Sequence, residues 1–330
     1  MLNSISERAL QSDAAGANQT RGAYNEHMFA YHLNGMKWTD SDHKNQAMKL
    51  KKSLDSIGPQ EARIQDDRAK EQASAFLDHA KSLGYSGVDE IHNTAKAGGI
   101  EAATGIKLSQ QENPSDIIVK FKKKPAKATH GFFGASLKSS TAAKIGFHNG
   151  GAGTMDKELG TNIEAIAKER HENFRKKNNL STAVGERAKQ IKGEGDQKRN
   201  NSLYDAASEA ANNTHEDIRN HLNDHYSGMK QKDLKSHLLN TFLKADSSKE
   251  NIPYVKAHGR GGGDKDASAH IEAPHDNPVY HAIKNANNIT MEKSGKSYLR
   301  VMADGKKAFS IQVKHNNEPM ASSIKILGQP

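Results

Sequence analysis

Cysteine is absent from the 330 residues of this chain. Its absence excludes disulfide bonds, thiolate zinc sites and cysteine nucleophiles. Long apolar stretches are lacking too, since no run approaches the roughly 20 residues with which a helix crosses a bilayer. The first residues also lack the apolar core of a secretion signal. These absences predict an intracellular protein, located in the cytoplasm and without a membrane partner.

Aromatic residues make up only 5% of the chain and hydrophobic residues 34%, whereas 26% are charged. This composition leaves a lean core for the length and favours helices that extend into solvent. Lysine and arginine outnumber aspartate and glutamate by 48 to 39. Seven lysines and one acid fall between Asp116 and Lys144. A positive charge that is concentrated in one segment favours a polyanionic partner such as nucleic acid.

Two short apolar segments, 117–121 and 131–138, are separated by a basic break that contains proline. This pattern predicts a β-hairpin. Side chains alternate along a strand, so Ser136 and Lys138 project from one face. In an antiparallel pair, Asp116 before the first strand lies close to Lys138 near the end of the second. A carboxylate beside an ammonium is able to hold a divalent ion and orient a water, as phosphodiester hydrolysis requires.

The pattern resembles the PD-(D/E)xK nuclease superfamily. Pro114-Ser115-Asp116 matches the first half of its motif and Ser136-Leu137-Lys138 the second, within roughly residues 20–160. The resemblance implies an α/β fold, in which a restriction-endonuclease-like mixed sheet is flanked by helices. It also implies a Mg²⁺ cofactor, with Mn²⁺ as the alternative. Asp116 is then expected to bind the ion, and Lys138 to orient the attacking water.

Two departures from the family motif are evident. Ser115 intervenes between the proline and the aspartate, and Ser136 stands where the second acid is expected. An upstream helical acid often joins such a site, a role that suits Glu26. One branch of restriction enzymes also carries Ser-x-Lys and recruits a glutamate from the following helix, which suggests Glu158 here, or else Asp156. The expected catalytic residues are Asp116, Lys138, Glu26 and Ser136, and the expected metal ligands are Asp116, Glu26 and Glu158.

Several polar residues in and beside the hairpin are candidate contacts to DNA phosphates. Losing one such contact weakens binding to all sequences alike. These candidates are Lys120, Lys122, Lys123, Lys124, Lys127, Ser139 and Ser140.

Composition along the chain suggests five parts. These are a flexible tail (1–20), a nuclease-like α/β core (21–153), a helical insertion or arm (154–250), a mobile Gly- and His-rich loop (251–278) and a β-rich C-terminal part (279–330). In the last part, Asp304-Gly305 signals a hairpin turn. The Gly-rich segment 150–153 lacks the Lys-Ser/Thr ending of a phosphate-binding loop. The histidines between 258 and 281 are spaced too irregularly for a zinc signature.

The sequence and the resemblance together therefore favour a Mg²⁺-dependent endonuclease that acts on double-stranded DNA. The resemblance, and no residue of the chain, also suggests an enzyme of the kind that a phage or mobile element encodes for use inside a host cell. Two alternatives stay open. One is a non-catalytic nucleic-acid-binding protein on a degenerate nuclease fold, for which Ser136 is the best indication. The other is a phage structural or assembly protein whose polar helices mediate self-association. The sequence does not decide whether the chain forms a homo-oligomer.

Overall fold

The computed structural model describes residues 13–94, 98–108, 112–139, 147, 149–193, 202–245 and 252–329. The chain divides into two compact units. The first contains residues 1–145 and 246–277, and the second contains residues 146–245 and 278–330. Each unit has its own five-stranded sheet, and the chain is a mixed α/β protein. No helix among the described residues has the length and apolar character needed to cross a membrane.

The sheet of the first unit has the strand order β1-β2-β3-β5-β6. All neighbouring strands are antiparallel except β3 and β5, which are parallel. The strands are β1 (Ser86–Asn93), β2 (Ile117–Lys123), β3 (Phe132–Ser139), β5 (Tyr254–Gly262) and β6 (Lys265–Glu272). The hairpin expected from the sequence is therefore present as β2 and β3.

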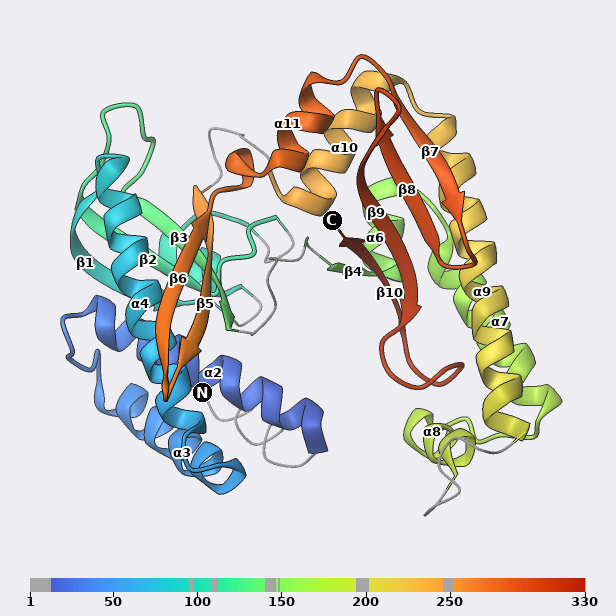
Figure 1. Cartoon of the computed structure of the whole chain (residues 1–330), viewed down its shortest axis with the longest axis horizontal. Helices are drawn as coiled ribbons and strands as arrows, with labels where there is room; N and C mark the ends of the chain where they lie inside the picture. The colour runs from blue at the N-terminus through green and yellow to red at the C-terminus, as the bar shows by residue number, and fades with distance from the viewer. Residues whose placement is uncertain are drawn as a thin grey trace. The chain divides into compact units, whose positions relative to one another are not determined.

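Helices α2 (Asp13–Leu33) and α4 (Glu61–Ser82) pack on one face of this sheet, and α3 (Ser41–Ile57) packs against these two helices; all three are blue in Figure 1. The core between helices and sheet contains alternate residues of β3, namely Phe133, Ala135 and Leu137. On the opposite face, Ile118 packs against Ile100 of the short helix α5 (Gly99–Thr104). Because side chains alternate along a strand, Ser136 and Lys138 lie on the face opposite α2 and α4.

Helix α4 lies close to β5 because both elements carry small residues where they meet. Its buried positions include Ala62, Ala69 and Ala73 at helical spacing. A Cβ on Gly259 of β5 would lie 2.9 Å from Arg68 Cβ and 3.0 Å from the amide carbon of Gln72. The glycines of this segment thus permit a close approach of strand and helix. The mobile loop that was expected over 251–278 is instead largely β5 and β6.

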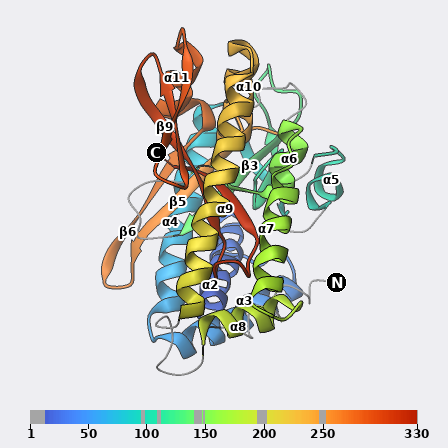
Figure 2. The ribbon, with the colours of Figure 1, turned by 90° about the vertical axis from the view of Figure 1, so that its right-hand side faces the viewer.

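The second unit contains an antiparallel sheet with the order β4-β10-β9-β8-β7. Its strands are β4 (Asn149–Gly151), β7 (Ile289–Ser294), β8 (Tyr298–Ala303), β9 (Lys306–His315) and β10 (Ile324–Gln329). Its helices are α6 (Ala152–Leu159), α7 (Ile163–Lys177), α8 (Val184–Lys192), α9 (Ser202–Ser227), α10 (Gln231–Leu243) and α11 (Pro278–Asn285). Figure 2 shows α7 and α9 side by side.

The helices of residues 154–245 do not form a separate arm. Ile218 and Leu222 of α9 and Phe242 of α10 share one core with Phe309 and Ile311 of β9. The expected insertion and the expected β-rich C-terminal part therefore form one unit. The first unit also differs from the nuclease-like core that was expected over 21–153, because it excludes residues 146–153 and includes residues 246–277. The tail that was expected over 1–20 is helical from Asp13.

A chain of three histidines crosses the second unit. The Nε2 atoms of His171 on α7 and His315 on β9 are 2.8 Å apart, and His315 Nδ1 lies 2.8 Å from Nε2 of His215 on α9. Burial lowers the pKa of His171 and of His215 to about 4 and that of His315 to about 3. For His171, the nearby charge of Arg187 contributes to this lowering of the pKa after burial. The three imidazoles are therefore held neutral in the folded protein.

Acidification is expected to destabilise the second unit through these histidines. In the unfolded chain they take up protons near pH 6.5, whereas in the folded chain they stay neutral to about pH 4. Their stabilisation is thus complete above about pH 6.5 and is lost as the pH falls toward 4, by about 1.4 kcal/mol per pKa unit. Urea unfolding at pH 7.5, 6 and 5 measures this loss. In His315→Gln the decline should be shallower, and an equal decline in both proteins would contradict the assignment.

Candidate functional site

The two ends of the expected motif meet at one end of the β2–β3 hairpin. Asp116 immediately precedes β2, and Lys138 is the last residue but one of β3. The antiparallel register pairs Ile117 with Ala135, which brings Asp116 beside Ser136. Lys138 is exposed, Asp116 is half-buried and Ser136 is buried. The acid, the hydroxyl and the amine are thus gathered at one end of the β2–β3 hairpin.

Hydrogen bonds fix the carboxylate of Asp116. The backbone N–H of Leu137 donates to its Oδ2 at 2.7 Å, and Ser136 Oγ lies 3.5 Å from the same oxygen. Burial raises the pKa of Asp116, while the charge of Lys138 and these two donors oppose the increase. The ammonium of Lys138 is therefore close enough to act on Asp116 electrostatically.

The extra serine in the Pro-Ser-Asp segment has a structural role. Ser115 is fully buried, and its N–H and its hydroxyl both donate to Asn113 Oδ1, at 3.2 and 2.5 Å. The carbonyl of Ser115 accepts from the hydroxyl of Thr94 at 2.5 Å. Asn113 in turn donates to the carbonyl of Ile252 at 2.7 Å. This buried network holds the turn from which Asp116 enters β2, so the departure from the family motif is part of the local fold.

Glu26 is on helix α2, which packs on the other face of the sheet, and it lies near the start of β2, because its partner Asn93 pairs in register with Ile117. Its Oε2 accepts a hydrogen bond from Asn93 Nδ2 at 3.2 Å, and the residue is half-buried. Burial, and after it the neighbouring charge of Asp116, raises the pKa of Glu26 to about 7 against the opposing effects of Asn93 and Lys138. The negative charges of Glu26 and Asp116 disfavour each other. A cation bound beside both carboxylates would relieve this repulsion.

An amide of helix α4 supports the backbone of the site. Gln72 is fully buried, and its Nε2 donates to the carbonyls of Lys138 at 3.1 Å and Ala257 at 2.6 Å. Asn25, next to Glu26, donates to Gln72 Oε1 at 2.9 Å and to the carbonyl of Gln65 at 3.2 Å. One connected set of hydrogen bonds therefore links the helix that carries Glu26 to the strand that carries Lys138.

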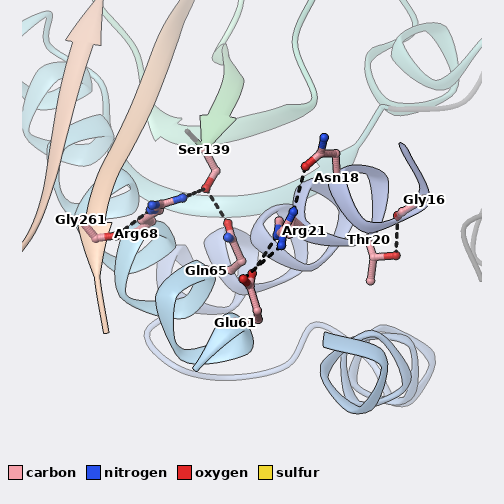
Figure 3. Close-up of polar contacts among 9 residues, drawn as sticks. All are labelled: Gly16, Asn18, Thr20, Arg21, Glu61, Gln65, Arg68, Ser139 and Gly261. Carbon is pink, nitrogen blue, oxygen red and sulfur yellow. Dashed lines mark hydrogen bonds and ion pairs between the residues drawn. The ribbon is translucent and has the colours of Figure 1, made fainter. Parts of the chain in front are cut away.

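A second set of polar contacts lies one residue further along β3 (Figure 3). The hydroxyl of Ser139 donates to Gln65 Oε1 and accepts from Arg68 Nη1 at 3.1 Å. Arg68 Nε also donates to the carbonyl of Gly261 at 2.8 Å. Ser139, an expected DNA contact, thus has its hydroxyl held by α4. Ser140, another expected contact, lies outside the described residues.

The basic segment between β2 and β3 lies far from this site, which corrects its expected position. Because the strands are antiparallel and Asp116 and Lys138 lie at one end, Lys122, Lys123, Lys124 and Lys127 lie at or near the other. At about 3.3 Å per residue, β2 separates the two ends by roughly 20 Å. Lys120, within β2, forms ion pairs with Asp89 and Glu90. Phosphate contacts by these lysines would therefore be remote from the reacting bond.

The acids suggested as replacements for the missing carboxylate belong to the second unit, where both have other partners. Glu158 Oε1 lies 3.3 Å from Lys244 Nζ. Asp156 accepts from the backbone N–H groups of Ile163 and Glu164, at 2.6 and 2.8 Å, and so caps the start of α7. Within the second unit, Asp156 thus has a structural role and Glu158 has an ion pair. Neither acid belongs to the unit that carries Glu26, Asp116 and Lys138.

Two carboxylates fit the ligand requirements of Mg²⁺. This ion usually retains several waters and takes one or two protein carboxylates together with phosphate oxygens of the substrate. Glu26 and Asp116 meet that description, and their mutual repulsion favours a cation between them. Within the described part of the chain, no group of three or more His, Asp or Glu side chains has the arrangement of a metal site. A resident zinc site of the usual type is thus not found there.

Three residues of this region were not anticipated from the sequence. Gln72 and Asn93 are polar residues in segments that were expected only to be helical or irregular. Lys256 lies on β5, where it pairs in register with Ser136. The alternation of Lys256 with His258 after the apolar segment 252–255 is a signal for a strand with Lys256 on one face. The glycines that follow are more typical of a loop, and they obscured that signal.

Comparison of this chain with protein-family models, with curated proteins and with solved structures finds no match in any of the three. A function must therefore be inferred from the residues of the site and their arrangement.

Proposed function

We propose that this protein is a Mg²⁺-dependent endonuclease that hydrolyses phosphodiester bonds of double-stranded DNA, on a sheet of the restriction-endonuclease type. The observation that carries the proposal is the placement of Asp116 and Lys138 at one end of two neighbouring strands, with Glu26 approaching from α2. An excess of nine basic over acidic residues agrees with a polyanionic substrate.

Each residue of the site has a distinct part in this proposal. Glu26 and Asp116 would hold the ion, and Mn²⁺ would substitute for Mg²⁺ because it accepts the same oxygen ligands. When bound, Mg²⁺ supplies Lewis-acid stabilisation of the phosphate oxygens and lowers the pKa of water. Lys138 orients the attacking water and stabilises the negative charge that develops on the phosphate. Gln72 and Leu137 N–H keep Lys138 and Asp116 in place through the contacts described above.

One observation favours a second candidate function. Ser136 leaves the site one carboxylate short of the family pattern, so a protein that binds DNA on this fold without cleaving it is the alternative. Such a protein would retain the fold and the positive net charge, and it would lose only the ion affinity that cleavage requires.

Supercoiled plasmid separates the two candidates. The wild-type protein is expected to nick or linearise the plasmid with Mg²⁺ or Mn²⁺ and to be inactive with EDTA. Lys138→Met should lose cleavage, whereas Lys51→Met, which alters an exposed lysine paired with Asp55 on α3, should retain it. Binding without cleavage by the wild type would favour the non-catalytic alternative. Cleavage that persists in Lys138→Met would refute the proposed site.

A further inference from the structure

The face of the sheet that carries Lys138 has a row of polar residues running across four strands. Asp116 lies beside Ser136, the register pairs Ser136 with Lys256 on β5, and it pairs Lys256 with Glu272 on β6. Residues paired in register on adjacent strands project from the same face. Lys256 is therefore a neighbour of the proposed site on the side away from Asp116.

Lys256 is unusual in being buried, with only 7% of its surface exposed. Lysine is almost never buried this deeply unless it is paired. Glu272, directly opposite on β6, supplies an opposite charge, and its Oε1 also accepts from Asn277 Nδ2 at 2.8 Å. Burial lowers the pKa of Lys256, the charge of Glu272 raises it, and the charge of Lys138 lowers it. The two lysines are thus near enough to repel each other.

The residue at position 136 determines how much negative charge lies next to Lys256. A carboxylate at that position would place Lys256 between two acids, one on each neighbouring strand. With Ser136 there, Lys256 pairs in register with a neutral hydroxyl on β3 and with the acid Glu272 on β6. An anion that enters beside Lys138 would relieve the repulsion between the two ammonium groups. The anion that the proposed function brings to this place is the phosphate of the DNA backbone.

We propose that Lys256 is a second phosphate-contacting lysine of this site, which holds the scissile phosphate from the side opposite Asp116. This inference rests on the proposed function. It assigns Lys256 to substrate binding and leaves the attack by water to Lys138. It also accounts for the Ser-x-Lys pattern, because the lost acid of β3 would have neutralised Lys256.

Binding of a 20-base-pair duplex in Ca²⁺, measured by fluorescence anisotropy over a range of salt concentrations, tests the inference without cleavage. Lys256→Met should weaken binding roughly tenfold and reduce the slope of log affinity against log salt by about one. Lys265→Met, an exposed lysine at the start of β6, should leave both quantities unchanged. Lys256→Arg, which keeps the positive charge, should largely restore binding.

A structural role for Lys256 would give different results. Removal of Lys256 alone takes away the positive charge that lies opposite Glu272 in register and endangers folding, whereas replacing two buried opposite charges together by apolar residues is often neutral. The double variant Lys256→Met/Glu272→Leu should therefore fold and still bind the duplex weakly. Wild-type affinity and salt slope in that folded variant would overturn the inference, as would an equal loss of affinity in Glu272→Gln.

The outcomes also separate this inference from the proposed function. If the wild type cleaves plasmid and the folded double variant binds and cleaves equally well, Lys256 has no part in the site and the nuclease proposal stands. If the wild type binds but does not cleave, weaker binding by the double variant supports the phosphate contact while the nuclease proposal fails. A wild type that does not bind the duplex even at low salt would refute both.

Discussion

Asp116→Asn is expected to abolish Mg²⁺-dependent cleavage of plasmid, with a loss of at least about 100-fold, because a bound ion supplies several kcal/mol of transition-state stabilisation. Asparagine preserves the size of the side chain and an oxygen that is able to accept from Leu137 N–H, which in the wild type donates to Asp116 at 2.7 Å. What it removes is the negative charge. The measurement is the initial rate of nicking at saturating Mg²⁺, compared with that of the wild type.

The control for this variant is its stability. Burial raises the pKa of Asp116, so its charge is a cost to the folded protein that Lys138 only partly offsets. The midpoint of thermal unfolding should therefore stay the same or rise when the charge is removed. A variant that unfolds at a lower temperature would point to a structural role for the carboxylate. A stable variant with full activity would exclude Asp116 as a metal ligand.

Phe76→Ala is expected to lower the free energy of unfolding of the first unit by about 3–5 kcal/mol, the usual range for a fully buried aromatic residue. Phe76 on α4 has no exposed surface. Its ring centroid lies 5.7 Å from that of Phe29 on α2, 6.4 Å from that of Phe121 on β2 and 5.4 Å from that of Phe133 on β3. The ring therefore joins both helices to both strands of the hairpin that carries the site.

Urea unfolding, followed by far-ultraviolet circular dichroism, measures this loss. Leu83→Ala is a matched control, because Leu83 follows the same helix and is 46% exposed. Its effect should be below about 0.5 kcal/mol. Similar losses in the two variants would show that α4 is not anchored through Phe76. Cleavage should also decline in Phe76→Ala at temperatures where the first unit is partly unfolded.

Hairpins and turns of this fold were predictable because the residues that determine them are close together in the sequence. Asp304 and Gly305 both have positive φ, 48° and 77°, and they form the two-residue connection between β8 and β9 that Asp-Gly indicates. The strand pattern around Asp116 and Lys138 also sufficed to predict the hairpin. In both cases, the interacting residues are separated by short stretches of chain.

Long-range pairing was not predictable in the same way. β3 and β5 are parallel neighbours that are separated by more than a hundred residues, and Ser136 pairs with Lys256. Nothing in the sequence of segment 251–278 indicates its partner strand. The glycines of this segment are typical of a loop, and only the packing of α4 on β5 explains them. Gly259, for example, is explained only by the nearness of Arg68 and Gln72. The role of Lys256 was hidden for the same reason.

The order of segments along the chain has a consequence for biosynthesis. The first unit is interrupted after residue 145 and resumes at residue 246, and the second unit is interrupted in turn by residues 246–277. When only residues 1–145 have left the ribosome, β5 has not yet been synthesised. The edge of β3 that pairs with β5 in the folded protein is then without its partner strand. Neither unit is encoded by one continuous stretch, so no single cut in the gene yields an intact half.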